Sequence, residues 1–244
     1  MIRSLKKIVS LILLLTALPG LAQKHKRSAA SAPATPSQPI KLMVDATQAP
    51  QKILHAQEEI PVAPGPVTLV YPKWIPGEHG PTGPITDFTG LEFFAGGKRL
   101  TWRRDLVEMY AFHVDVPQGV NTVEAKFDLA MPAPPEGFSS GASATTQLLV
   151  LSWNQVVLYW QGAKSDDVTV QAEVKLPAGW HFGTALQPQN ESLASNTSGE
   201  ISFKPVSLTM LVDSPVLSGA HFRRIQLSPG PIEHYIDIAA DSEA

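Results

Sequence analysis

Histidine and carboxylate residues that lie close in the sequence are the first candidates for chemistry, because together they bind metal ions and transfer protons. The chain has seven histidines and no cysteine. None of the histidines belongs to an H-E-x-x-H sequence, the helical spacing that places two zinc ligands on one face with a general base between them. His55 and Glu58 fall in a strand pattern without a third ligand close by, and a strand would point the neighbours Glu233 and His234 to opposite faces. We therefore predict no catalytic residue, no metal site and no cofactor from these residue types.

One short segment matches a catalytic pattern. Residues 137–141 read Gly-Phe-Ser-Ser-Gly and fit G-x-S-x-G, with Ser139 at the position of the nucleophile. That motif works because a sharp strand-to-helix turn exposes the serine and supplies backbone donors. Here a proline-rich segment precedes the serine and a strand pattern follows it, so the helix that the motif requires is not predicted. A serine hydrolase is accordingly the least favoured of the three functions considered, and full activity of a Ser139→Ala variant would exclude it.

The stretch from Val67 to Leu91 is the most unusual in the chain. It begins as a strand, with apolar side chains at every second position, and then becomes a loop rich in proline and glycine. Proline fixes φ and restricts the unfolded chain, so this loop can follow a defined path at a reduced cost in entropy. We predict a binding or docking loop formed by Trp74, Ile75, Pro76, Gly77, Glu78 and His79. The alternative is a long strand connection whose tryptophan caps the end of the core.

The elements that must position this loop are short strands. Strand patterns separated by turn signals fill residues 40–244, and few stretches have helical periodicity. Val168–Leu176 alternates apolar and polar residues most clearly, and Gly96-Gly97 marks a two-residue hairpin. Further strands are expected at Leu106–Val116, Leu148–Trp153, Val156–Trp160 and Leu208–Val212, with the middle two paired. This pattern predicts an all-β fold, an antiparallel two-sheet β-sandwich that forms a single domain.

The first 39 residues differ in composition from the rest. Three basic residues, an apolar run and the small-x-small sequence Gly20-Leu21-Ala22 follow one another, which is the pattern of a cleavable export signal. We predict a signal peptide at residues 1–22, a disordered linker at residues 23–39, and a periplasmic or secreted protein with no membrane span after signal cleavage. An uncleaved anchor is the alternative. Without cysteine, such a protein depends on its core and not on disulfides.

The distribution of charge argues against nucleic acid as a partner. The formal net charge is −3, and six of the 19 Lys and Arg residues lie within the first 30 positions. The remaining chain is therefore clearly acidic, and an acidic surface repels phosphate backbones and anionic membranes. With 43% hydrophobic residues, the chain can bury a sizeable core. We expect a folded domain that does not bind nucleic acid.

Four stretches of the chain resemble one known family in order and spacing. The two more specific stretches are Tyr-Pro-Lys-Trp-Ile-Pro-Gly at residues 71–77 and Leu-Val-Asp-Ser-Pro-Val at residues 211–216. Leu-Pro-Ala-Gly-Trp at residues 176–180 and the segment from Gly90 to Trp102 accompany them. Over about residues 40–240, the chain resembles the N-terminal domain of the M61 glycyl aminopeptidases, a family of zinc metallopeptidases. Glu78-His79 departs from the family pattern, in which a small residue and then a tyrosine are expected.

In that family the β domain precedes a thermolysin-like catalytic domain, which holds H-E-x-x-H and a further Glu ligand. The resemblance therefore implies a domain that is not an enzyme on its own. We expect an exported accessory or docking domain, or a truncated remnant, of a zinc aminopeptidase. Its partner would be a separately encoded zinc-peptidase catalytic domain, or a peptide. Asp213, Ser214 and Pro215 would form a structural turn, closed by the Asp side chain ahead of proline. The alternative function is a free-standing module of the cell envelope that binds peptide or glycan.

Overall fold

The computed structural model describes residues 38–75, 77–131, 143–190, 199–228 and 230–243. The predicted signal peptide, residues 23–37 of the predicted linker and the Ser139 motif lie outside the described residues. None of the helices in the described ranges is long and apolar enough to cross a membrane.

The described chain is built almost entirely from short strands. In chain order its elements are β1 (Ile40–Asp45), η1 (Ala49–Gln51), β2 (Ile53–Pro61), β3 (Gly65–Val70), β4 (Phe88–Ala95), β5 (Lys98–Leu100), β6 (Trp102–Arg104), β7 (Ala111–Val116), β8 (Thr122–Ala130), β9 (Ser143–Ala144), β10 (Leu148–Leu151), η2 (Trp153–Gln155), β11 (Tyr159–Trp160), β12 (Thr169–Lys175), β13 (His181–Gly183), β14 (Glu200–Ser202), β15 (Val206–Ser207), α1 (Leu208–Val212), β16 (Val216–Gly219), β17 (His221–Ser228) and β18 (His234–Ala240).

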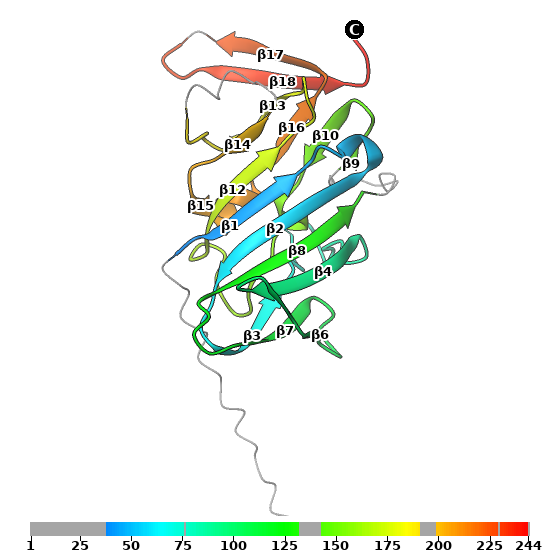
Figure 1. Ribbon diagram of the computed structural model, residues 1–244. Helices are drawn as coiled ribbons and strands as arrows, with labels where there is room; N and C mark the ends of the chain where they lie inside the picture. The colour runs from blue at the N-terminus through cyan, green and yellow to red at the C-terminus, as the bar shows by residue number, and fades with distance from the viewer. Residues whose placement is uncertain (1–37, 76, 132–142, 191–198, 229, 244) are drawn as a thin grey trace, which may run out of the picture. The chain divides into compact units, whose positions relative to one another are not determined.

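The largest sheet has eight strands and forms one layer of the fold (Figure 1). Its strands follow the order β14-β12-β1-β2-β8-β4-β5, and β15 pairs with β12 outside this path. Strands β1 and β12 pair in parallel, with Ile40 beside Val170, whereas the other pairs of this sheet are antiparallel. A parallel pair needs a long crossover connection, and here the chain between the two strands supplies most of the second layer.

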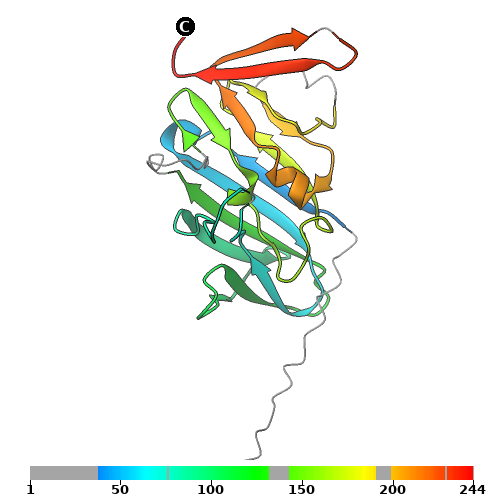
Figure 2. The same ribbon diagram turned by 180° about the vertical axis from the view of Figure 1, so that it is seen from behind.

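Two four-stranded sheets face the large sheet and come forward in Figure 2. One has the order β13-β16-β10-β9 and the other the order β11-β3-β7-β6. Buried and exposed residues alternate along β2, β8 and β12, as expected for strands with one face on a core. The fold is therefore an all-β sandwich, which confirms the prediction, and its second layer is divided between two sheets.

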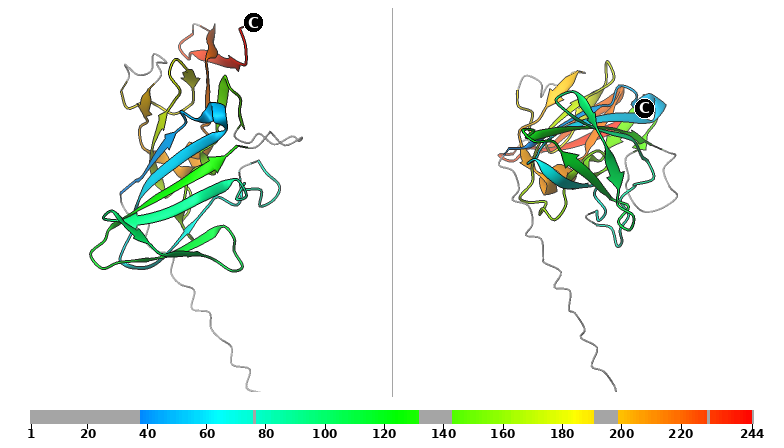
Figure 3. Two further views of the ribbon diagram at one scale, coloured as in Figure 1. Left: turned by 45° about the vertical axis from the view of Figure 1, so that its right-hand side comes forward. Right: turned by 60° about the horizontal axis from the view of Figure 1, so that its bottom comes forward.

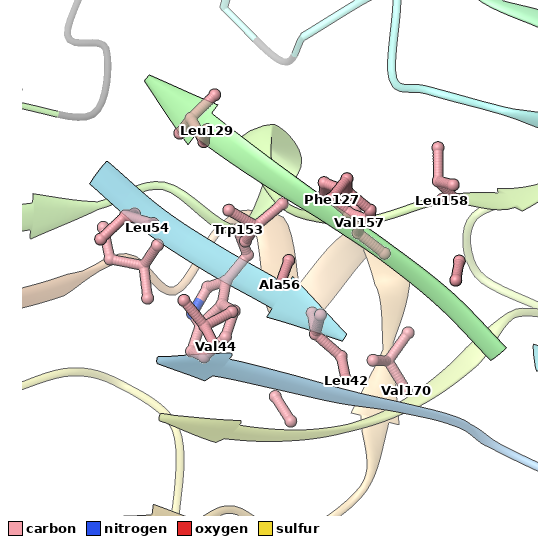
Figure 4. Close-up of a cluster of buried hydrophobic side chains, with 14 of the residues drawn as sticks. Leu42, Val44, Leu54, Ala56, Phe127, Leu129, Trp153, Val157, Leu158 and Val170 are labelled. Carbon is pink, nitrogen blue, oxygen red and sulfur yellow. The ribbon is translucent and has the colours of Figure 1, made fainter. Parts of the chain in front are cut away.

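The core lies between these layers (Figure 4). On the large sheet, Leu42 and Val44 alternate along β1, and Phe127 on β8 belongs to the same buried cluster. Trp153 and Val157, from the segment between β10 and β11, are completely buried against them. Burial of apolar surface of this extent is the main favourable contribution to folding, and it explains how the chain does without disulfides.

Two apolar segments adopt structures other than those predicted. Val156–Trp160 does not pair with Leu148–Trp153, because β11 pairs with β3, whereas β10 pairs with β16 and β9. Leu208–Val212 is the helix α1, at whose start the Ser207 side chain accepts a hydrogen bond from the amide of Met210. Serine is a favoured N-cap residue, and in a five-residue apolar run periodicity cannot separate a strand from a helical turn.

One carboxyl group lies inside this core. Glu58 is fully buried on the inward face of β2, and the amide of Leu158 donates to both of its carboxyl oxygens at 3.0 Å. Burial raises the pKa of Glu58 well above its ordinary value, because the charged form loses its hydration. The carboxyl group thus ties the large sheet to the segment that leads into β11.

Candidate docking surface

The predicted docking loop begins at a buried anchor, Tyr71. Its amide donates to the carbonyl of Tyr110, and its hydroxyl donates to the carbonyl of Gln155 at 3.1 Å. Its ring packs against Phe88, with ring centroids 5.0 Å apart. Burial raises the pKa of Tyr71, so its hydroxyl remains a donor at neutral pH. The chain therefore leaves β3 and enters the loop from a fixed position.

The loop folds back on its own start at Gly83. The amide of Gly83 donates to the carbonyl of Lys73 at 3.1 Å. An ideal Cβ at Gly83 would lie only 1.9 Å from the carbonyl oxygen of Pro72, so a larger residue requires the backbone to move. The hydroxyl of Tyr110 donates to the carbonyl of Gly83 at 2.8 Å. These contacts fix the segment that carries Trp74.

A second loop, residues 105–110, connects β6 to β7, where the sequence predicted the start of a strand. One carboxyl oxygen of Asp105 accepts hydrogen bonds from the amides of Val107 and Glu108, each at 2.9 Å. Its other oxygen lies 2.8 Å from Nε2 of His113. The two backbone amides and the histidine lower the pKa of Asp105, because they stabilise its charged form. This carboxylate holds the tip of the second loop in one conformation.

His113 also contacts the hydroxyl of Thr68 through Nδ1, at 2.9 Å. Thr68, His113 and Asp105 thus form a hydroxyl–imidazole–carboxylate series, the order of groups in a nucleophilic triad. Thr68 and His113 are direct cross-strand partners, and the backbone around Thr68 lies within the β3–β7 and β11–β3 ladders. A backbone used in this way does not offer the paired free amides of an oxyanion hole. The series therefore supports the second loop from the sheet.

An ion pair joins the two loops. Nζ of Lys73 lies 2.6 Å from Oε2 of Glu108 and 5.4 Å from the centre of the Tyr110 ring. The hydrogen bond from Lys73 lowers the pKa of Glu108. Both side chains of the pair are about a third exposed, and such pairs stabilise a fold by less than about 1 kcal/mol. The pair orients the two loops, whereas the contact of Tyr110 with Gly83 holds them together.

Four large apolar side chains on these two joined loops are exposed, and we call them the apolar loop surface. It consists of Trp74 (66% exposed), Leu106 (97%), Val107 (95%) and Met109 (50%). Groups of exposed apolar residues with polar residues around them are typical of protein or ligand contact sites. Trp and Met are also enriched at the centres of protein interfaces.

The residues predicted for the docking loop are all on the loop held by Gly83, with Pro76 outside the described residues. Trp74, Gly77 and His79 are exposed, and Ile75 and Glu78 are partly buried. The amide of Glu78 donates to the carbonyl of Ile75 at 3.0 Å, which closes a turn that contains Gly77. The sequence analysis missed Leu106, Val107 and Met109, because their spacing reads as a strand. The signal that distinguishes them is Asp105, since Asp commonly closes a turn with the amides that follow it.

Asp213, Ser214 and Pro215 follow the C-terminal end of α1, where the chain turns. The turn is closed by main-chain bonds, because the amides of Asp213 and Ser214 donate to the carbonyls of Thr209 and Leu211. The Asp213 side chain is exposed, and no Asx hydrogen bond from it is found among the described residues. The role predicted for that side chain is therefore not observed.

The carbonyl of Ser214 explains why this turn is needed. It accepts hydrogen bonds from Nε1 of Trp153 at 2.9 Å and from the hydroxyl of Thr184 at 3.2 Å. A buried indole N–H requires such a partner. The turn is thus a structural element that serves the core.

The histidines and carboxylates considered for metal binding are separated by the fold. Nδ1 of His55 lies 2.6 Å from the Asp128 carboxylate on β8, whereas Glu58 on the same strand is buried on the opposite face. Within the described ranges, no group of three or more His, Asp or Glu side chains is arranged to hold a metal ion.

Comparisons with known proteins give the family and the fold. Residues 41–220 match the family described as Peptidase M61 N-terminal domain. The crystal structure of an aminopeptidase N family protein from Idiomarina loihiensis is similar with a TM-score of 0.69 at 14% identity, covering 84% of this chain and 33% of that chain. An M1 zinc metallopeptidase from Deinococcus radiodurans gives a TM-score of 0.46 at 13% identity, covering 82% of this chain and 46% of that chain. A comparison with curated proteins gives no match.

The chain therefore spans about a third of the length of the first of these structures, and at this identity the likeness shows a shared fold. The residues that match the family make up well over half of the chain and contain both loops of the apolar loop surface. The chain belongs to the Peptidase M61 N-terminal domain family.

Proposed function

We propose that this protein is an exported, non-catalytic accessory domain that docks on the catalytic unit of a zinc aminopeptidase. The observation that carries the proposal is the apolar loop surface. Its four large apolar side chains are exposed to solvent, and hydrogen bonds and an ion pair hold the two loops that carry them. A surface that is already ordered loses little further entropy on binding, and such preorganisation favours affinity. Trp74 would be its central anchor.

The family supports this choice of partner. The domain that matches residues 41–220 is named for its place at the N-terminus of a peptidase, and the similar structure from Idiomarina loihiensis is about three times as long as the part that aligns. The partner would then hydrolyse the peptide bond, and this chain would recognise or position the substrate. Export follows from the predicted signal peptide, and fractionation of cells that express the full chain tests it.

Binding to the catalytic unit is the direct test. The probe is the H-E-x-x-H catalytic unit of an M61 peptidase encoded by the same genome, produced without an N-terminal domain and titrated with the full chain by calorimetry. We expect Leu106→Asp to weaken binding by about 2 kcal/mol or more, since a charge would enter an apolar contact. Met210→Asp on α1 is the matched control, because Met210 is 44% exposed and lies outside both loops. Absence of any such gene, or equal binding by both variants, contradicts the proposal.

The non-catalytic part of the proposal has its own assay. The full chain alone, supplied with zinc, is incubated with glycyl peptides, and we expect no hydrolysis above background. Turnover that a chelator abolishes would show that the chain contains a metal site of its own.

A second function from another class is a free-standing module of the cell envelope that binds peptide or glycan. The exposed ring of Trp74 favours it, because aromatic faces stack on ligands without a partner domain. The test is a titration with soluble peptides or glycans, followed by quenching of tryptophan fluorescence. Quenching that is lost in Trp74→Ala and unaffected by the catalytic unit would select this function over docking.

A further inference from the structure

A second exposed apolar region lies on the hairpin β17–β18, which follows the last residue of the family match, 220. The hairpin is a separate two-stranded sheet beside β13 and β16 (Figures 1 and 3). Six large apolar side chains of the hairpin and its turn are between 36% and 71% exposed, and they are Ile225, Leu227, Ile232, Tyr235, Ile236 and Ile238. No other strand pair in the described ranges exposes so many.

The register of the hairpin separates its two faces. Side chains directly opposite each other in an antiparallel pair share a face. Ile225 lies opposite Ile236, and Arg223 lies opposite Ile238, so these four residues share one face. The face carries three neighbouring isoleucines and a guanidinium group. We call it the isoleucine face.

The other face of the hairpin is held against the sandwich. The ring of Phe222 stacks near His181 of β13, with ring centroids 6.4 Å apart. An ideal Cβ at Gly183 would lie 1.9 Å from the carboxylate of Asp237, so β13 and β18 approach closely here. Asp237 also binds the guanidinium of Arg224 through two hydrogen bonds of 2.6 and 2.7 Å. Because this face is turned to the sandwich, the isoleucine face is turned away from it.

The isoleucine face lacks the layer that a sheet face of this composition normally has. The face has one isoleucine on β17 and two at alternate positions on β18, and clustered β-branched residues are typical of a sheet face that packs on another element. Within the described part of the chain, Arg223 forms no ion pair, and Ile225 and Ile236 remain 36% and 44% exposed. The face is therefore complementary to an apolar surface that presents a carboxylate.

We propose that the isoleucine face is a second contact site for the zinc-peptidase catalytic unit, which would cover the three isoleucines and place a carboxylate against Arg223. This inference rests on the proposed function. The catalytic unit is the favoured occupant because the hairpin lies just beyond the N-terminal domain match, and the similar crystal structure continues well beyond the length of this chain. An unpaired guanidinium at the edge of an apolar face also selects its partner, since a surface without an opposite charge would leave it desolvated and unpaired.

The test is calorimetric titration of the full chain with the same catalytic unit. Ile236→Asp should weaken binding by about 30-fold or more, and Arg223→Ala by roughly tenfold, as expected for a central apolar contact and a charged contact. The matched control is Gln226→Asp, which adds the same charge to the other face of the hairpin, and it should bind as the wild type does. Circular dichroism of each variant verifies that the fold is retained.

The outcomes separate this inference from the proposed function. If Leu106→Asp weakens binding and Ile236→Asp does not, the isoleucine face is not a contact site and the proposed function stands. If the wild-type chain does not bind the catalytic unit, the proposed function fails and the inference fails with it. Equal losses in Ile236→Asp and Gln226→Asp would attribute the effect to the hairpin as a whole and would overturn the assignment to one face.

Discussion

The apolar loop surface and the isoleucine face expose the same kind of side chain, but they are supported in different ways. The loop surface is held by polar contacts that reach the core, with Tyr110 on Gly83 and Asp105 on His113. The hairpin is held by its own ladder and by a few contacts of one face with β13 and β16. The first surface is therefore held in one conformation without a partner. The second lacks a layer, and we expect it to gain order when a partner covers it.

Gly83→Ala should have the largest effect, and it should affect the loop surface alone. A Cβ at Gly83 would lie 1.9 Å from the carbonyl oxygen of Pro72, so the loop must move and lose its contacts with Lys73 and Tyr110. We expect a loss of about 2–4 kcal/mol in the free energy of unfolding, measured with urea. Gly80→Ala is the control, because a Cβ there would meet an ordinary contact at 4.0 Å. Equal stability of the two variants would show that Gly83 does not brace the loop.

The buried Glu58 predicts a pH dependence of the stability of the fold. Its pKa is raised in the folded state, so the folded protein binds the proton more tightly than the unfolded chain does. Its contribution therefore makes the protein less stable as the pH rises above the ordinary carboxyl value towards the raised one. Below the ordinary value, the contribution of Glu58 to stability no longer changes with pH, since the group is protonated in both the folded and the unfolded state.

The unfolding free energy of the wild type, relative to Glu58→Gln, should therefore increase as the pH is lowered from 8 to about 5. The carboxylates with lowered pKa, Asp45, Asp105 and Glu108, act in the opposite direction, but only below about pH 5. Urea titrations across the pH range measure the difference. A constant difference between wild type and variant would contradict the assignment of a protonated carboxyl group to the core.

Arg224→Ala should loosen the hairpin and leave the loops unchanged. The Arg224–Asp237 pair is bidentate, but the Arg side chain is 36% exposed, so we expect a global loss of at most about 1 kcal/mol. Hydrogen exchange should accelerate at the amides of β17 and β18 and remain the same at residues 105–110. Faster exchange in the loops as well would mean that the two regions are coupled.

Lys73→Met should have the smallest effect. The ion pair with Glu108 is partly exposed, and its loss is expected to cost between 0 and about 1 kcal/mol, with a smaller cost in high salt. Because Tyr110 still holds Gly83, binding to the catalytic unit should change less than in Leu106→Asp. A larger loss of binding in Lys73→Met would show that Lys73 itself contacts the partner.

The sequence predicted the parts of this fold that depend on local pattern. The alternation of apolar and polar residues predicted a strand at Val168–Leu176, which is observed as β12. Gly96-Gly97 predicted the turn between β4 and β5. The parallel pairing of β1 with β12 was not predictable in this way, because it joins segments far apart in the chain. The partners of β10 and β11 were missed for the same reason. The short run at α1 lacks enough residues for its periodicity to appear.

The sequence indicated one of the two loops of the candidate site. The proline and glycine content of the first loop indicated a defined path, and Trp74 is exposed on it. The second loop was hidden, because Leu106, Val107 and Met109 look like a strand unless the turn at Asp105 is recognised. The ion pair between Lys73 and Glu108 joins residues that are far apart in the sequence, so no local pattern predicts it.

Hydrogen–deuterium exchange on the full chain, with and without the zinc-peptidase catalytic unit, tests the central claim most directly. We predict slower exchange on complex formation at residues 73–75, at residues 105–110 and along β17 and β18, with the larger change in the hairpin because it is less supported before binding. Unchanged exchange in both regions at saturating catalytic unit would contradict the account.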